Sequence, residues 1–194
     1  FEAVKTLEEF DLSFDPGIPV QQIRDLATCS FVQQHASVIV CGPVGAGKTH
    51  IAQALGYEAC KRGYSVLFTK TSHLLRTLGG GRADGTWEER FRSYLKPDVL
   101  ILDDFAMKEL TSPQAEDLYE LIDQRTGRAS FIVTSNRSPH NWYPLFPNPV
   151  LAESTLDRLV NSSHHVALTG KSYRSKLRPG QTQPVDEGGA SDVT

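Results

Sequence analysis

The chain has 194 residues, of which 39% are hydrophobic and 22% charged, with 20 basic and 23 acidic side chains. This composition is typical of a globular protein, and the length predicts one compact domain that needs neither a disulfide framework nor a structural metal. Apolar runs such as 38–41 and 99–102 are far shorter than the roughly 20 residues that cross a bilayer. We therefore expect no membrane span and no membrane partner.

Charge is unevenly distributed along the chain. The segment after Arg178 has acidic residues but no basic ones, so the rest of the chain is neutral despite the net charge of −3. A nucleic-acid surface would therefore require local segregation of basic residues.

The cysteine and methionine content bears on the redox compartment of the protein and on whether its N-terminal part is present in this chain. Cys29, Cys41 and Cys60 are an odd number of cysteines without a C-x-x-C pair. This pattern predicts free thiols in a reducing compartment, and hence a cytoplasmic protein. The single methionine is Met107, whereas the chain begins with Phe1. We expect that an N-terminal domain of the whole protein is missing from this chain.

Helical and strand patterns alternate along the sequence. Apolar periodicity, Gly and Pro predict helices over 19–35, 48–62, 72–78, 112–125 and 152–160, and strands over 37–41, 66–68, 99–102, 131–133 and 166–168. Within helix 112–125, Ser112 is the expected N-cap, with Pro113 at the first helical position. This order predicts an α/β fold, with a mostly parallel five-stranded sheet flanked by helices. We expect a flexible Gly79–Gly81 stretch and a proline-rich loop over 139–149. Residues 1–178 are expected to form one domain, and residues 179–194 a disordered tail.

A glycine-rich loop joins the first predicted strand to the next helix. Gly42–Thr49 matches G-x-x-x-x-G-K-[ST], the phosphate-binding loop of P-loop NTPases, and has the strand and helix on either side that this motif requires. Backbone N–H groups of such a loop converge on phosphates, and the following helix contributes its positive N-terminus. The motif therefore predicts binding of ATP and Mg²⁺, with Lys48 on the β/γ phosphates and Thr49 on the metal. The predicted nucleotide-binding residues are Gly42, Gly45, Ala46, Gly47, Lys48 and Thr49.

Acidic and amide side chains follow two later strands. Asp103 and Asp104 end an apolar strand at the edge where ligands sit in open α/β sheets. Asp103 suits Mg²⁺, and Asp104 suits a general base or water-positioning group, although it is one methylene shorter than glutamate. Asn136 ends the fourth strand and could contact water or the γ-phosphate, but an Asn here is equally consistent with turn chemistry. An isolated Asp-Asp pair would only indicate a polar strand end.

These motifs resemble those of the AAA+ ATPases, and within them the IstB-like and DnaC-like group, from Thr6 to about Lys176. The resemblance depends on 6–11, on 25–28, on the phosphate loop with 50–56, on 98–105 and on 156–159, and IstB is the closer match. It implies an ATPase that self-associates with ATP between subunits, binds double-stranded DNA and works with the transposase of its insertion sequence.

The resemblance also implies that Arg158 reaches into a neighbour's ATP site. The alternative is that Arg158 is a surface residue paired with Asp157 or Glu153. Arg174 is a candidate second sensor, although too little chain follows for a separate lid domain.

DNA contacts are predicted from the basic segment 61–92, which carries more basic than acidic residues. Lys70, Arg76 and Arg82 are the candidates, and a solvated charged face is the alternative. Trp87 in the same segment is expected to be exposed.

Phe10 and Phe14 are candidate neighbours of the adenine or, alternatively, core residues.

Two other functions share these motifs. One is a helicase loader similar to DnaC, which would bind a helicase in place of a transposase. The other is a small-molecule kinase, which would need an arginine-rich lid and an acceptor pocket that the sequence does not indicate.

Overall fold

The computed structural model describes residues 5–10 and 16–169. A five-stranded parallel sheet forms the centre of the fold, in the order β2-β3-β4-β1-β5. The strands are β1 (Ser37–Cys41), β2 (Val66–Lys70), β3 (Val99–Asp103), β4 (Ser130–Ser135) and β5 (Ser163–Ala167). The predicted α/β fold is therefore confirmed.

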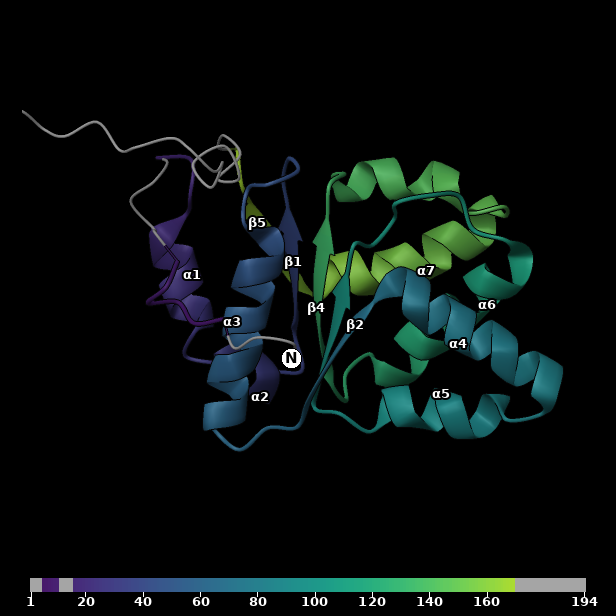
Figure 1. Ribbon diagram of the computed structural model, residues 1–194. Helices are drawn as coiled ribbons and strands as arrows, with labels where there is room; N and C mark the ends of the chain where they lie inside the picture. Colours follow the sequence, from purple (N-terminus) through teal and green to yellow (C-terminus); the bar gives the residue numbers. More distant parts are fainter. Residues whose placement is uncertain (1–4, 11–15, 170–194) are drawn as a thin grey trace, which may run out of the picture.

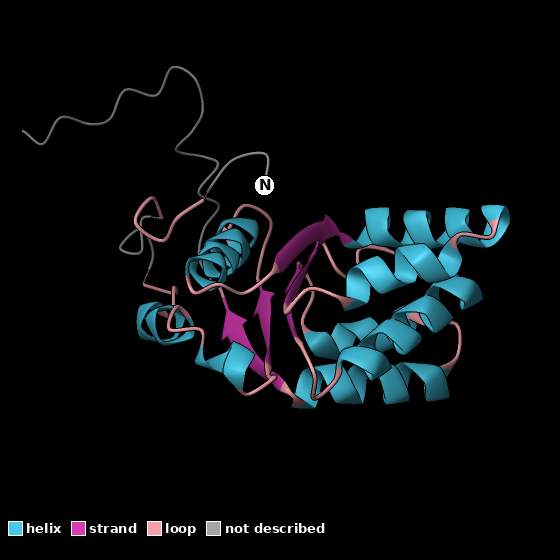
Figure 2. Ribbon diagram, turned by 90° about the horizontal axis from the view of Figure 1, so that it is seen from below, coloured by secondary structure: helices cyan, strands magenta, loops and turns pink. Residues whose placement is uncertain are grey.

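Helices cover both faces of the sheet (Figures 1 and 2). α1 (Val20–Leu26), α2 (Ser30–Gln33) and α3 (Lys48–Lys61) pack on one face. The other face is covered by α4 (Thr71–Asp84), α5 (Trp87–Leu95), α6 (Ser112–Arg125), the 3-10 helix η1 (Pro139–Leu145) and α7 (Pro149–Asn161). No helix within the described residues has the length and apolar character needed to cross a membrane.

Alternation along the central strands divides the core into two layers. In β3, Val99 and Ile101 pack with α1–α3, whereas Leu100 and Leu102 pack with the helices on the opposite face. Successive side chains of a strand point to opposite faces, so a strand covered on both sides reads as a continuous apolar run. The apolar run 99–102 is therefore a consequence of burial on both faces.

The predicted helix over 19–35 is wrong, because the chain forms two short helices there. Cys29 lies between them in the left-handed region, with φ of 61°. The Thr28 hydroxyl donates a hydrogen bond to the carbonyl oxygen of Asp25 at 2.6 Å, beside the end of α1. Both helices bury apolar residues in the same layer, which is why their combined pattern imitates one helix.

Two more differences lie between β2 and β3. Gly79–Gly81 lies inside α4 instead of forming a flexible stretch, and the sequence reading missed α5 altogether. A Cβ on Gly81 would lie 2.8 Å from Cα of Trp87, so glycine is needed for the close approach of α4 and α5. The expected exposure of Trp87 is also wrong, since its ring is half-buried and stacks on Phe91 at 4.5 Å.

The remaining boundaries differ only slightly from the predictions. Part of the predicted loop over 139–149 is helical, in η1 and at the first residue of α7. β5 begins three residues before its predicted start. The N-cap of α6 is Thr111 instead of Ser112, in a capping box with Gln114. The predicted tail over 179–194 lies outside the described residues.

Candidate functional site

The phosphate loop runs from the end of β1 to the start of α3, with the backbone that its glycines predict. Gly45 and Gly47 have φ of 84° and 90°, in the left-handed region that favours glycine. A Cβ on Gly47 would lie 2.4 Å from Cε2 of Phe10, and a Cβ on Gly42 would lie 2.5 Å from the carbonyl oxygen of Leu168. Neighbouring segments therefore pack directly on the loop backbone at both of its ends.

Lys48 is held against the loop from which it projects. Its side chain is buried, and Nζ donates a hydrogen bond to the carbonyl oxygen of Pro43 at 2.8 Å. The ammonium group is thus placed within the curve of the loop, where the partial positive end of α3 also favours an anion.

Asp103 and Thr49 meet at the base of the loop. The Thr49 hydroxyl donates to Oδ1 of Asp103 at 2.8 Å, and Asp103 is buried at the end of β3. A hydroxyl and a carboxylate beside a phosphate site are oxygen ligands of the kind that Mg²⁺ prefers, with phosphates and water completing its shell. These two residues therefore fit the predicted metal role.

Thr134 also belongs to this site, although the sequence reading did not identify it. Its hydroxyl donates to Oδ1 of Asp103 at 2.6 Å and accepts the backbone N–H of Asp104 at 3.1 Å. Thr134 is fully buried on β4, two residues before Asn136. The sequence signal that could have identified Thr134 is its hydroxyl near the end of β4, the strand that pairs with β3.

Asp104 lies at the same edge of the sheet but in different surroundings. It has φ of 56°, a left-handed conformation that turns its carboxylate away from the direction of β3. Its Oδ2 lies 3.5 Å from Nζ of Lys70, the last residue of β2. Asp103 and Asp104 are therefore distinguished by the fold, one buried against hydroxyls and the other partly exposed beside a cation.

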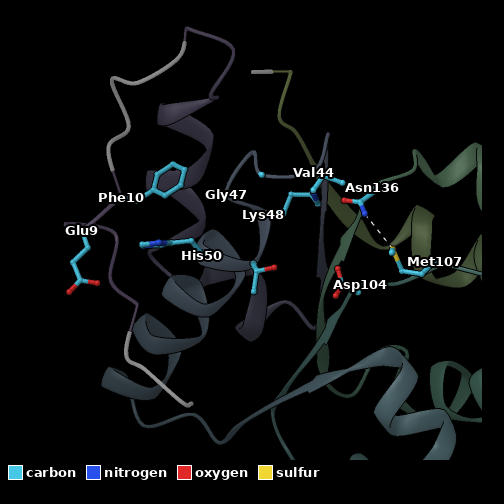
Figure 3. Close-up of a pocket in the computed structure, with 11 residues that line it drawn as sticks. Glu9, Phe10, Val44, Gly47, Lys48, His50, Asp104, Met107 and Asn136 are labelled. Atoms are coloured by element: carbon cyan, nitrogen blue, oxygen red, sulfur yellow. Dashed lines mark hydrogen bonds between the residues drawn. The ribbon is translucent and has the colours of Figure 1, made fainter. Parts of the chain in front are cut away.

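A cavity of about 410 Å³ connects these groups, which is within the range of small-molecule sites. Figure 3 shows Phe10 and His50 on one side of the phosphate loop and Asp104, Met107 and Asn136 on the other. The cavity is lined by Glu9, Phe10, Val44, Gly45, Gly47, Lys48, Thr49, His50, Asp104, Met107 and Asn136. The cavity thus brings the phosphate loop together with Asp104 and Asn136.

Glu9 and Phe10 line one side of the cavity. Nε2 of His50 lies 2.8 Å from the carbonyl oxygen of Thr6, and the His50 and Phe10 rings are 5.1 Å apart. Phe10 therefore lines the cavity beside the phosphate loop and also packs against the core layer of α1–α3, so both of its predicted roles stay open. Phe14 and Arg174 lie outside the described residues.

Arg158 does not line the cavity of its own chain. On α7 its Nε lies 3.2 Å from Oδ1 of Asp123, its Nη1 donates to the carbonyl oxygen of Ser154, and the guanidinium lies over the ring of Tyr119. The sequence reading considered Asp157 and Glu153 as surface partners, but the ion pair is formed with α6.

The three DNA candidates have different surroundings. Lys70 faces Asp104, and Arg76 is exposed on α4 with Nη2 3.2 Å from Nδ1 of His73. Arg82 pairs with the buried carboxylate of Asp117 at 2.5 Å, and this carboxylate also accepts the indole N–H of Trp87. Arg82 therefore joins α4, α5 and α6.

Cys41 precedes the phosphate loop directly. Burial raises the pKa of its thiol to about 11, although the nearby charge of Lys48 acts in the opposite direction. The thiol is therefore protonated at neutral pH and is a poor nucleophile.

The family model of IstB-like ATP binding proteins matches residues 1–180 of this chain. The chain belongs to this family. A Mycobacterium tuberculosis relative, named for ATP binding in an insertion sequence, is 55% identical over 94% of the IstB-like chain and 73% of its own length. A similarly named IS21 relative from Pseudomonas aeruginosa is 39% identical over 89% of the chain and 65% of its own length.

Solved structures show the same fold. The crystal structure of DnaI has a TM-score of 0.75 at 21% identity, and the match covers 85% of the IstB-like chain and 91% of that protein. Replication initiator DnaA, bound to AMPPCP and single-stranded DNA, has a TM-score of 0.70 at 22% identity. This match covers 89% of the IstB-like chain and 54% of that protein. The IstB-like chain thus shares its fold with these proteins and spans about half of DnaA.

Proposed function

We propose that this IstB-like chain binds ATP with Mg²⁺ and hydrolyses it to ADP and phosphate. The contact between the Thr49 hydroxyl and Asp103 at the base of the phosphate loop carries the proposal, because a loop with an oxygen pair at its base is suited to a metal-bound triphosphate. Mg²⁺ held there would neutralise charge on the phosphates. Lys48 contributes a second positive charge within the curve of the loop.

Asp104 and Asn136 are the proposed water-positioning groups. Both line the cavity, and the fold presents a carboxylate and an amide from two neighbouring strands. Asp104 is shorter than glutamate and lies beside Lys70, so we infer that an isolated subunit hydrolyses ATP slowly.

Binding and turnover test this proposal separately. Lys48→Ala should abolish binding of a fluorescent ATP analogue in the presence of Mg²⁺, whereas Asp104→Asn should retain binding and lose phosphate release. Lys96→Ala is the matched control, since Lys96 lies outside the cavity. ATP binding that survives Lys48→Ala would contradict the proposal.

We propose further that the chain self-assembles on double-stranded DNA, with Arg158 of one subunit completing the ATP site of the next. This role is supported by the position of Arg158, which is half-exposed on α7 and away from its own cavity. A planar cation supplied by a neighbour would link hydrolysis to assembly. Arg174 remains a proposed second sensor of bound nucleotide.

Mixing two inactive variants tests this arrangement. Lys48→Ala and Arg158→Ala should each lack turnover, and their mixture on duplex DNA should recover part of it, because some interfaces combine an intact Lys48 with an intact Arg158. A mixture as inactive as its components would contradict a role for Arg158 in the neighbouring site.

The proposed partner is the transposase of the same insertion sequence. Curated relatives named for insertion sequences support this choice. Co-purification with that transposase, compared with a replicative helicase, is the test, and ATP-dependent capture of the helicase alone would favour a helicase loader. Stimulation of turnover by duplex DNA and not by nucleosides would argue against a small-molecule kinase.

A further inference from the structure

The Asn136 side chain has a single hydrogen-bond partner within the described part of the chain. Its Nδ2 donates to Sδ of Met107 at 3.4 Å (Figure 3). Both side chains line the nucleotide cavity. The contact joins the end of β4 to the turn that follows β3.

The backbone around Asn136 is held on both sides. Oγ of Ser135 donates to the carbonyl oxygen of Phe105 at 2.9 Å and accepts the indole N–H of Trp142 at 3.2 Å. The same indole N–H lies 3.2 Å from the carbonyl oxygen of Arg137. With both neighbours fixed, rotation of its side chain is the main freedom left to Asn136.

The turn that carries Met107 is equally well anchored. Phe105 is buried and packs edge-on against Trp142 at 4.7 Å, and its N–H donates to the carbonyl oxygen of Thr134 at 2.8 Å. Asp104 and Ala106, on either side of it, are both left-handed. The turn therefore presents Asp104 and Met107 to the cavity from a rigid base.

Packing alone does not account for a methionine at this position. Met107 is 54% exposed and is one of three large apolar residues that are exposed among those described. Its side chain thus gains little from burial, whereas its sulfur meets the amide of Asn136.

The chemistry of the two groups determines the orientation of the amide. An amide has a donor end and an acceptor end, and its terminal torsion is broad and nearly two-fold. A thioether accepts a hydrogen bond but has no hydrogen to donate. Met107 therefore favours the rotamer in which Nδ2 faces the sulfur and Oδ1 faces the opposite way.

We propose that Met107 is a positioning residue for ATP hydrolysis, which fixes the amide orientation of Asn136. The inference rests on the proposed function, in which Asn136 contacts the attacking water or the γ-phosphate. Only one of the two Nδ2 hydrogens is used by the sulfur, so the other N–H and Oδ1 stay available to the cavity.

Substitutions at position 107 separate orientation from packing. Met107→Leu keeps the size and removes the acceptor, and it should lower kcat on duplex DNA by about three- to tenfold, the value of one modest hydrogen bond. KM for ATP should stay within about twofold, because the phosphate loop holds the nucleotide. Met107→Gln restores an acceptor oxygen but also adds an amide donor that can pair with Oδ1 of Asn136, so it should recover only part of the lost kcat.

A double-mutant cycle tests whether Met107 acts through Asn136. In an Asn136→Ala background, Met107→Leu should have no further effect on kcat. A full additional loss in that background, or a wild-type kcat for Met107→Leu alone, would overturn the proposal. Val150→Ala is the matched control, because Val150 is exposed but lies outside the cavity.

NMR of the Asn136 side-chain amide gives a readout that needs no turnover. Its signal, assigned by its loss in Asn136→Ala, should show faster proton exchange in Met107→Leu than in the wild type or Met107→Gln. If the wild type has no turnover but this difference persists, only the proposed hydrolysis is contradicted. Equal exchange rates in all three proteins would overturn the role of Met107.

Discussion

Nζ of Lys70 lies 3.5 Å from Oδ2 of Asp104, so a predicted DNA contact and a predicted catalytic carboxylate form an ion pair across the ends of β2 and β3. Both side chains are partly exposed, and exposed ion pairs are weak, about 0–1 kcal/mol. DNA phosphates could therefore compete with Asp104 for Lys70 at little cost in free energy.

Lys70→Ala should raise ATP turnover in the absence of DNA by about two- to fivefold, because a pair worth up to about 1 kcal/mol no longer restrains Asp104. Stimulation by duplex DNA should shrink correspondingly. Steady-state phosphate release with and without DNA measures both quantities, and Lys96→Ala is the control. An unchanged ratio of the two rates would show that Lys70 does not connect DNA to Asp104.

Thr134→Val should reduce Mg²⁺-dependent turnover by about tenfold, because Asp103 loses one of its two hydroxyl donors. Removing a buried hydrogen bond of this kind also costs about 1 kcal/mol of the free energy of unfolding. Thr134→Ser keeps the hydroxyl and should retain turnover. Equal turnover in the two variants would exclude a role for this hydroxyl.

Two glycines of α4 should respond to alanine in opposite directions. Gly79 is exposed with open space around its missing Cβ, so Gly79→Ala should stabilise the protein by about 1 kcal/mol. Gly81→Ala should destabilise it, since the added Cβ would lie 2.8 Å from Cα of Trp87. Urea denaturation gives both free energies. A stabilising Gly81→Ala would show that α5 does not pack as closely as described.

The three cysteines should differ in their reaction with a thiol reagent at pH 8. Cys60 is exposed and should react quickly, whereas burial raises the pKa of Cys29 and raises the pKa of Cys41 to about 11. One fast thiol is expected in the native protein and three after denaturation, and Cys60→Ser should remove the fast phase. A second fast thiol in the native protein would show that Cys29 or Cys41 is less protected than described.

The raised pKa of Cys41 also predicts how stability depends on pH. Its folded pKa of about 11 lies above the unfolded value of 9.0, so the folded state holds this proton more tightly. The contribution of this proton to the free energy of unfolding is complete below pH 9 and is lost as pH rises from 9 to 11. Cys41→Ser should reduce that slope in urea melts across this range. If the slope of the free energy of unfolding against pH is unchanged in Cys41→Ser, the pH dependence arises from other titrating groups.

The sequence by itself determined the phosphate loop, the acidic strand and the parallel sheet. Gly42–Thr49 lies between a strand and a helix, and 99–102 reads as a strand buried on both faces. These signals are local, because glycine conformation and apolar periodicity depend on neighbouring residues. The helix missed over 87–95 also carries such a local signal, because its apolar residues 87, 91, 94 and 95 recur at helical spacing and pack against one core layer.

The tertiary structure decided which distant side chains meet. It placed Thr134 on Asp103, Met107 on Asn136 and Lys70 on Asp104, each across adjacent strands of the sheet. It also assigned Arg82 to Asp117 and Arg158 to Asp123. Such pairs depend on strand order and helix packing, which bring together residues about 30 or more positions apart, whereas sequence spacing carries information only within one element.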